Sequence, residues 1–287
     1  VLTMARRWQA IAAINGGFFS RNTYSPLGAI RRDGVWYSSP ILNRGAIAWG
    51  NDGTVMINRL SLSQAITTNT GQSFPLLHTD SGYVQAGLSR YTLAWGNTYS
   101  PLTDNEVVIT VSRNQVVGQQ TLGKAGDNAI PLPADGYLLV ARSYRTAANA
   151  LPPGTIIQLT GTTMPPEFQN YPHIVGGGPL LLQGGQIVLD AAREQFSNAF
   201  ITEAAVRSAI ATLPNGNLAI VTVQHRVNGR GPTLAELAQI MQQLGTVDAL
   251  NLDGGSSTTL YLGGQILNRS PRTTARVHNS IGIFLSF

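Results

Sequence analysis

The residues that could do chemistry gather in four polar, glycine-rich turns beside short apolar runs. The most distinctive is "ALNLDGGSSTTLYLGG", Ala249–Gly264, where Asp253 ends an apolar run and precedes two glycines, two serines and two threonines. A carboxylate held at a strand end can act as a base or nucleophile, while glycine N–H groups and hydroxyls bind anionic oxygens. The same acid could equally cap its own turn by accepting backbone N–H bonds, so both roles stay open.

Three further turns of this kind carry other functional groups. "AIAAINGGFF" ends an apolar run at Asn15, "HIVGGGPLLL" contains three glycines, and "AAVRSAIA" places Arg207 and Ser208 in an apolar strand. Glycines after a strand often only make a turn, and Arg207 could simply be the outward residue of a half-buried strand. If the four turns meet, they bring backbone N–H donors, an amide, a guanidinium and one carboxylate into one cleft.

Other catalytic motifs are absent from the sequence. A hydrolase nucleophile elbow needs G-x-S-x-G, whereas "GGSS" is followed by Thr258. There is no G-x-x-x-x-G-K-[ST] phosphate loop, and "GGGP" lacks the G-x-G-x-x-G spacing. The chain has no cysteine, and its four histidines show no zinc-ligand spacing, so we predict no metal site and no cofactor.

The amino-acid composition limits the classes of partner that the protein can be expected to bind. The chain has 287 residues, 43% of them hydrophobic, which predicts a globular protein with a sizeable core. Basic residues outnumber acidic ones by 19 to 14, but they are scattered arginines with one lysine, Lys124, which argues against nucleic acid. Single arginines beside polar turns suit a small phosphate instead. No apolar run approaches the roughly 20 residues of a membrane helix, and nothing indicates an oligomeric state.

The elements that must position these turns are mostly strands. Turn dipeptides between short apolar runs predict five β-hairpins, and "EVVITVS", "GYLLVARS" and "TIIQLTG" predict further strands. The predicted hairpin turns are Asp33-Gly34, Asn51-Asp52-Gly53, Gly184-Gly185, Pro214-Asn215-Gly216-Asn217 and Gly263-Gly264.

Helices are few. The best prediction is Thr233 to Leu244, with a capping box formed by Thr233 and Glu236 and an apolar stripe. Others are expected near Leu2 to Gln9 and, more weakly, over Ala191 to Phe200. The pattern is α+β, with β-rich mixed sheets, a few helices packed on them and no βαβ alternation. We expect a single large domain over residues 1–287, with an inserted lobe at about 62–150, where Asn, Thr, Gln and Pro are enriched.

Five segments in this order resemble the phosphodiester glycosidase domain family: "AIAAINGGFF", "VGGGPLLLQGG", "VRSAIA…NGNLAIV", "RGPTLAELAQIMQQLG" and "ALNLDGGSSTTL". The resemblance runs from about Ala10 to Ile283 and is weakest between residues 62 and 150. It implies hydrolysis of a sugar-1-phosphodiester at the glycosidic C1–O bond, giving free sugar and a phosphate monoester. It also implies an extracytoplasmic, bacterial protein, and because the chain begins "VLTMARRWQA" we expect that an export signal could have been removed.

The resemblance also places residues in the active cleft. The implied catalytic residues are Asp253, Arg207 and Asn15; the implied substrate-binding residues are Gly16, Gly17, Gly177, Gly254, Gly255, Ser256, Thr258, Arg276 and His225. The chain departs from the family at one point: an ungapped reading puts Gln224-His225 where members often have Asp-Gly. His225 either replaces that Asp or is unrelated to it.

A glycosyl phosphate has a good leaving group, so the usual pair of carboxylates is less necessary. One carboxylate, Asp253, and an arginine clamp of Arg207 and Arg276 could suffice, with Glu194 and Glu203 as acids in reserve. The expected partner is a small or polymeric sugar phosphodiester. Two alternatives remain: a non-catalytic surface module that binds carbohydrate or phosphate, and a phosphodiesterase that breaks the P–O bond.

Overall fold

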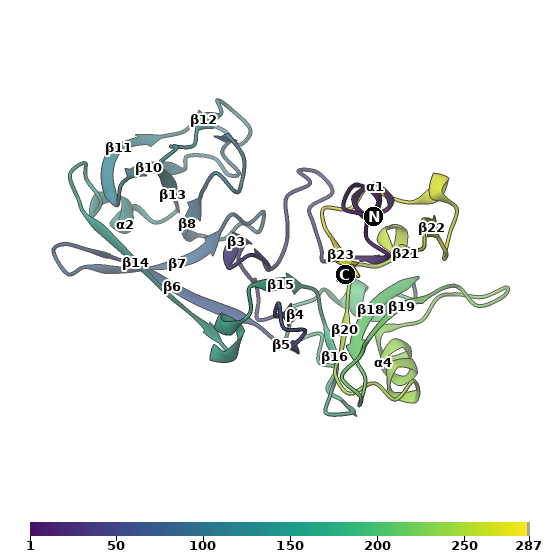
Figure 1. Cartoon of the computed structure of the whole chain (residues 1–287). Coiled ribbons are helices and arrows are strands. Elements are labelled where there is room, and N and C mark those ends of the chain that lie inside the picture. The colour runs from purple at the N-terminus through teal and green to yellow at the C-terminus, as the bar shows by residue number, and fades with distance from the viewer. Residues whose placement is uncertain (286–287) are drawn as a thin grey trace.

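The computed structural model describes residues 1–285, and these form β-sheets with a few short helices (Figure 1). The fold is therefore the β-rich α+β arrangement predicted from the sequence. The first sheet has the strand order β22-β21-β1-β23, all antiparallel. Its strands are β1 (Ala12–Asn15), β21 (Leu260–Leu262), β22 (Gln265–Ile266) and β23 (Ser280–Ile283), and α1 (Leu2–Arg7) packs on it.

Two five-stranded sheets complete this part of the molecule. The second has the order β3-β2-β15-β4-β5 and the third β17-β16-β20-β18-β19. The second comprises β2 (Ile30–Arg32), β3 (Val35–Ser38), β4 (Gly45–Trp49), β5 (Val55–Arg59) and β15 (His173–Gly176). The third comprises β16 (Leu180–Gln183), β17 (Gln186–Ile187), β18 (Arg207–Thr212), β19 (Leu218–Val223) and β20 (Ala249–Asn251).

One apolar core joins these three sheets. Ile14 of the first sheet, Ile47 of the second and Leu250 of the third are each at most 1% exposed and belong to the same buried cluster. The helix α4 (Leu234–Gln243) covers another face of the third sheet through Leu237 and Met241. Because the strand ends converge on a shared core, residues far apart in the chain are fixed together. We call this part the three-sheet core.

The strands from β6 to β14 form a separate seven-stranded sheet, ordered β11-β10-β13-β8-β7-β6-β14, at the left of Figure 1. Its pairs are antiparallel except β7–β8. We call residues 61–164 the lateral lobe. Its elements are β6 (Ser61–Thr68), β7 (Ser73–Thr79), β8 (Gly87–Tyr91), β9 (Thr98–Tyr99), β10 (Val107–Ser112), β11 (Gln115–Thr121), β12 (Ile130–Pro131), β13 (Gly136–Arg142), α2 (Arg145–Asn149) and β14 (Ile157–Met164).

The lobe contains a buried ionic cluster. Arg142 donates through Nε to the Glu106 carboxylate at 2.6 Å, and its Nη2 donates to the Tyr91 and Tyr99 hydroxyls at 2.8 Å each. All four side chains are at most 3% exposed. A buried charge pair of this kind is retained only where further hydrogen bonds satisfy it, as they do here. The cluster fixes β8, β13 and the turns between them.

Local sequence signals predicted most elements. All five predicted hairpins are present, as β2–β3, β4–β5, β16–β17, β18–β19 and β21–β22. Thr233 caps α4, and Glu236 closes the capping box. The predicted helix over Ala191 to Phe200 is wrong: the chain turns over 191–195, and α3 (Asn198–Thr202) begins only after its N-cap, Ser197. The reason is Glu194, whose carboxylate is drawn inward to bind the three-sheet core.

Candidate active site

Asp253 and Arg207 lie across from each other at the end of the β18–β20 pair. The antiparallel register pairs Ala209 with Asn251, and two further residues bring Arg207 opposite Asp253. Backbone hydrogen bonds continue the ladder past the strand end: Leu252 N–H donates to the Ser208 carbonyl at 2.9 Å. Two of the four predicted turns therefore meet.

Asn15 joins a third turn to this pair. Its Nδ2 donates to the Asp253 carbonyl at 2.7 Å, and its Oδ1 accepts from the Ser208 hydroxyl at 2.7 Å and from Thr259 N–H at 3.0 Å. The side chain is fully buried. Because protein groups occupy both ends of the amide, Asn15 positions the Asp253 turn through its backbone.

The carboxyl of Asp253 is half-buried. Burial raises its pKa above the ordinary Asp value, while the Ser257 hydroxyl, the N–H of Gly254 and the charge of Arg21 oppose that rise. The Gly254 N–H donates to Oδ1 at 2.9 Å. The carboxyl is thus held at a strand end, partly desolvated and near a cation, which is a suitable environment for a base or nucleophile.

The turn after Asp253 is held largely by protein contacts. The N–H groups of Gly255, Ser257 and Thr258 donate to the carbonyls of Val206, Gly254 and Gly255. Arg269 donates to the Gly255 and Ser256 carbonyls at 2.8 Å each. Those N–H groups are therefore engaged rather than facing an open anion site. Ser256 is exposed, whereas Thr258 is buried.

Arg207 is buried rather than outward-facing. Its side chain is 1% exposed, because Nη2 donates to the Glu203 carbonyl at 2.6 Å and Nε to the Pro232 carbonyl at 3.5 Å. The guanidinium lies over the Phe200 ring at 5.1 Å, and its desolvation lowers its pKa. A Cβ placed on Gly254 would lie 3.9 Å from Nη1, so that nitrogen is directed toward the Asp253 turn.

The glycines predicted at the site permit close backbone approach. Gly16 accepts from Asp253 N–H at 3.1 Å through its carbonyl, and Gly17 N–H donates to Asn279 Oδ1 at 3.0 Å. A side chain on Gly17 would collide with the Gly176 carbonyl. Gly177 donates to the Gly45 carbonyl at 2.8 Å and is buried against the backbone of Asn251.

Two exposed arginines lie in the loops around Asp253. Arg21 is close enough to favour the ionised form of that carboxyl, and the Arg276 guanidinium lies over the Tyr24 ring at 5.6 Å. His225 is exposed beyond β19, and within residues 1–285 no hydrogen bond joins it to the Asp253 turn.

The two reserve acids have other surroundings. Glu194 is fully buried and accepts hydrogen bonds from Gly45 N–H, Leu180 N–H and Arg59 Nε, each at 2.9 Å. Its carboxylate is fully engaged in holding β4 to β16. Glu203 is exposed. Asp253 is therefore the carboxyl that combines partial burial with a neighbouring cation, Arg21.

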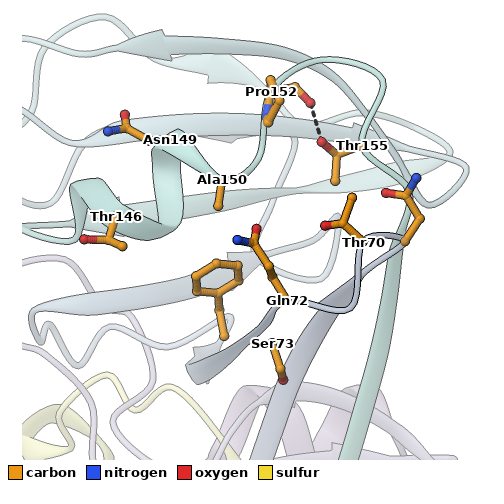
Figure 2. A pocket seen from close by; sticks show the side chains of 10 residues that line it. Thr70, Gln72, Ser73, Thr146, Asn149, Ala150, Pro152 and Thr155 are labelled. Carbon is orange, nitrogen blue, oxygen red and sulfur yellow. Dashed lines mark hydrogen bonds between the residues drawn. The ribbon is translucent and has the colours of Figure 1, made fainter.

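A large cavity elsewhere in the molecule is unsuited to acid–base chemistry. It has a volume of about 730 Å³ and lies in the lateral lobe, between the β6–β7 turn and α2 with the turn that follows it (Figure 2). Its lining consists of amide and hydroxyl side chains together with Phe74, Ala150 and Pro152, and it contains no acid, histidine or cation. Within the described part of the chain, no group of three or more His, Cys, Asp or Glu residues could hold a metal ion.

Sequence reasoning missed three residues of the site, Arg21, Arg269 and Asn279, and it also missed the hydroxyl of Ser257. Ser257 stood within the quoted motif, so its hydroxyl was available as a candidate. Asn279 lies in "RVHNSIGIF", beside Arg276. Arg21 and Arg269 gave no local signal beyond being arginines in polar loops.

Comparison with known proteins identifies the family of the chain. A family model for phosphodiester glycosidase matches residues 104–284. A hypothetical protein from Synechocystis is 52% identical over 98% of this chain, with a TM-score of 0.95, and this chain spans 52% of its length. No curated protein matches.

Two further solved structures are more distant. A protein from Burkholderia pseudomallei described as exported is 19% identical, with a TM-score of 0.78 over 99% of this chain and 68% of that one. The catalytic domain of zebrafish N-acetylglucosamine-1-phosphodiester α-N-acetylglucosaminidase is 13% identical, with a TM-score of 0.37 over 95% of each chain. The family model covers well over half of the sequence, including Arg207, Asp253 and Arg276. The chain therefore belongs to the phosphodiester glycosidase family.

Proposed function

We propose that this protein is a hydrolase that cleaves a sugar-1-phosphodiester at the glycosidic C1–O bond. Membership of the phosphodiester glycosidase family supports the reaction class. The observation that carries the proposal is the half-buried Asp253 carboxyl. Gly254 N–H donates to it and the charge of Arg21 acts on it, while Asn15 holds the backbone carbonyl of the same residue. A carboxylate next to a cation suits attack at an anomeric carbon beside a phosphate.

In the proposed reaction, Asp253 acts on C1 in one of two ways. As a base, it takes a proton from water, whose oxygen bonds to C1 while the C1–O bond breaks. As a nucleophile, it bonds to C1 first, and water then releases the sugar. In both cases the bridging oxygen leaves with the phosphate monoester. The anomeric configuration of the first product, measured by NMR, separates the two routes.

The arginines take the phosphate in this proposal. Arg21 and Arg276 are exposed, so they are free to make charge-assisted contacts with phosphate oxygens. Buried Arg207 contributes to phosphate binding through Nη1 and through the positive field of its guanidinium. Exposed Ser256 offers its hydroxyl to the substrate. The glycines at 16, 17, 177, 254 and 255 allow the backbone segments around Asp253 to pack closely. Thr258, buried in the turn after Asp253, and His225, exposed beyond β19, are secondary candidates for substrate binding.

The proposal also includes an extracytoplasmic location. The Burkholderia protein of the same fold is described as exported. None of the described helices is long and apolar enough to cross a membrane. Candidate substrates are therefore sugar phosphodiesters outside the cytoplasm, either small or within a polymer.

Hydrolysis in ¹⁸O-labelled water tests the proposal. The probes are methyl and p-nitrophenyl diesters of N-acetylglucosamine, glucose and galactose 1-phosphates. Label in the free sugar supports a phosphodiester glycosidase, whereas label in the phosphate identifies a P–O phosphodiesterase. Binding by calorimetry without any product identifies a non-catalytic binding module. Asp253→Asn is the active-site variant, and Glu203→Gln, which changes a nearby exposed acid, is its matched control.

A further inference from the structure

We propose that Asn268 and Arg269 are positioning residues for Asp253: they hold the turn that follows it, so that the Ser257 hydroxyl stays on the Asp253 carboxyl. The inference rests on the proposed function and deepens it, because it adds residues that act on the acid through its neighbours. Both residues follow β22, directly after the β21–β22 hairpin at the right of Figure 1. We call them the Asn268–Arg269 clamp.

Arg269 holds the first half of the turn. Its Nη2 donates to the Gly255 carbonyl and its Nη1 to the Ser256 carbonyl, each at 2.8 Å. Because a peptide unit is planar, fixing its carbonyl also fixes the direction of its N–H, and the second of these units carries the N–H of Ser257. A planar guanidinium holds two carbonyls in a defined geometry, which a lysine ammonium does with less control.

The part of the turn that Arg269 holds is the part with the most backbone freedom. Gly255 has a φ of +60°, in the left-handed region that favours glycine. It follows another glycine, Gly254, and begins a 3₁₀ turn of only three residues, Gly255–Ser257. Two adjacent glycines lose much conformational entropy when they are ordered. The two bonds from Arg269 therefore restrain the turn where its sequence restrains it least.

Asn268 holds the second half of the turn. Its Oδ1 accepts from Leu260 N–H at 2.8 Å, and its Nδ2 donates to the Thr258 carbonyl at 3.0 Å. Ser257 thus lies between two held stretches, and its own side chain is buried. A buried side chain on a fixed backbone has few rotamers open to it, so the direction of the Ser257 hydroxyl depends on the clamp.

The Ser257 hydroxyl has a large effect on the acid. Burial raises the pKa of the Asp253 carboxyl, and the hydrogen bond from Ser257 is the strongest of the effects that oppose this rise, ahead of Gly254 N–H and the charge of Arg21. Loss of the clamp should therefore raise the pKa of Asp253 further. Other charged or titratable side chains on the surrounding elements are Arg207 of β18, Glu203 after α3, and Arg272, Arg276 and His278 before β23.

Arg269 also joins the acid to the loop that carries Arg276. Its Nη1 donates to the Thr273 carbonyl at 3.4 Å. The Ser256 carbonyl, which Arg269 binds, accepts a second bond from Ala275 N–H at 3.3 Å. Ala275 directly precedes Arg276, to which the proposed function assigns phosphate binding. The clamp therefore fixes the proposed acid and a proposed phosphate ligand relative to each other.

The test follows the titration of the Asp253 carboxyl by NMR, on protein with ¹³C-labelled aspartate carboxyls, and Asp253→Asn identifies the signal. Arg269→Met should raise the titration midpoint by about one pH unit, as for loss of a hydrogen bond to a carboxylate. Arg269→Lys should restore part of this change, and it carries the comparison if Arg269→Met does not fold. Arg272→Met, which removes an exposed arginine of the same loop, is the matched control and should titrate like wild type.

A double-mutant cycle distinguishes the clamp from a simple effect of charge. Ser257→Ala should raise the midpoint as Arg269→Met does, and the two changes together should add little to either one. An equal effect of Arg269→Met with and without the Ser257 hydroxyl would show that Arg269 acts by its charge, and would overturn the inference. An unchanged midpoint in Ser257→Ala would overturn it as well.

Rate measurements then separate this inference from the proposed function. Arg269→Met should lower kcat on a p-nitrophenyl sugar-1-phosphodiester about tenfold to a hundredfold, as for a slightly misplaced catalytic group. The acid limb of kcat/KM should move to higher pH together with the NMR midpoint, because the reaction requires the ionised carboxyl. If the midpoint depends on the clamp but no diester is hydrolysed, the proposed function fails alone. If diesters are hydrolysed while Arg269→Met and Arg269→Lys leave the midpoint and the acid limb unchanged, the clamp fails alone.

Discussion

The side-chain amide of Asn15 donates a hydrogen bond to the backbone carbonyl of Asp253, with 2.7 Å between Nδ2 and the carbonyl oxygen. The same side chain accepts bonds from Ser208 and Thr259. One amide thus holds three chain segments at the place where the proposed chemistry occurs. The arrangement explains why an amide stands at the end of β1, where an apolar residue would fit the strand pattern.

Asn15→Ala should destabilise the protein substantially. It leaves the Asp253 carbonyl, the Ser208 hydroxyl and the Thr259 N–H without a buried partner, and each such group costs about 1–3 kcal/mol. We expect a loss of about 3 kcal/mol or more in the free energy of unfolding, measured by urea denaturation. Ser208→Ala removes one partner and should cost less. A loss below 1 kcal/mol for Asn15→Ala, on the order of a single weak hydrogen bond, would contradict this role.

Asp253→Asn should lower turnover by about 10³-fold or more if the carboxylate is the base or nucleophile. The measurement is initial rate on a p-nitrophenyl sugar-1-phosphodiester. Because Asn preserves the shape of the side chain, thermal stability should change little. Glu203→Gln should retain wild-type turnover, and a near-normal rate for Asp253→Asn would remove Asp253 from the mechanism.

The pH profile provides a separate test of Asp253. Burial raises the pKa of its carboxyl above the ordinary Asp value, and the reaction requires the ionised form. Activity should therefore be complete above the raised pKa and decline as the pH falls through it. The acid limb of kcat/KM should lie above the pH at which an exposed Asp titrates. An acid limb at or below that pH would show that another group controls the rate.

Arg276→Ala should weaken phosphodiester binding without unfolding the protein, because the side chain is exposed. We expect KM for the diester to rise about fivefold to thirtyfold, a loss of about 1–2 kcal/mol, as for a charge-assisted contact. KM for a neutral p-nitrophenyl glycoside of the same sugar should not change. Arg207→Ala is the contrasting variant: its buried guanidinium binds the carbonyls of Glu203 and Pro232, so stability should fall as well. Equal effects of Arg276→Ala on both substrates would exclude phosphate binding.

Local signals predicted the elements, because hairpin turns and helix caps are decided by neighbouring residues. The capping box of Thr233 and Glu236 spans three positions, and its geometry follows from those positions alone. Arg207 shows the opposite case. The sequence placed Arg207 in a strand. Whether its side chain faces solvent or the interior depends on the register between β18 and β20 and on carbonyls elsewhere in the chain, such as that of Pro232. The strand pattern could not decide this.

Asn279 and Glu194 show why the rest of the site was not predictable. Asn279 contacts Gly17 across 262 positions of sequence, and nothing near either residue records that pairing. Glu194 lies in a segment with helical composition, yet its carboxylate binds two buried N–H groups of distant strands, and the satisfaction of those groups outweighs local helix propensity. Long-range hydrogen bonds fix the positions of both Asn279 and Glu194, and such bonds leave no periodic pattern in the sequence.

Asp80 should make the stability of the protein depend on pH. Its carboxyl is fully buried in the lateral lobe, and this burial raises its pKa from 3.8 to about 6, although Thr92 hydrogen bonds and the charge of Arg90 oppose the shift. A raised pKa means that the folded state holds the proton more tightly than the unfolded state does. Stability from this group is therefore complete below pH 3.8 and is lost as the pH rises to about 6. The shift corresponds to about 3 kcal/mol.

Asp80→Asn isolates this effect, since the amide can accept from Thr92 N–H and donate to the Thr92 hydroxyl. The measurement is the free energy of unfolding by urea at a series of pH values from 3.8 to above 6, for wild type and variant. The variant should gain stability relative to wild type as the pH rises through this interval, and the difference should level off above it. Leu93→Ala, in the same region but without a titratable group, should give a constant difference. If the wild type and Asp80→Asn curves run parallel, Asp80 titrates alike in both states, and its burial carries no such penalty.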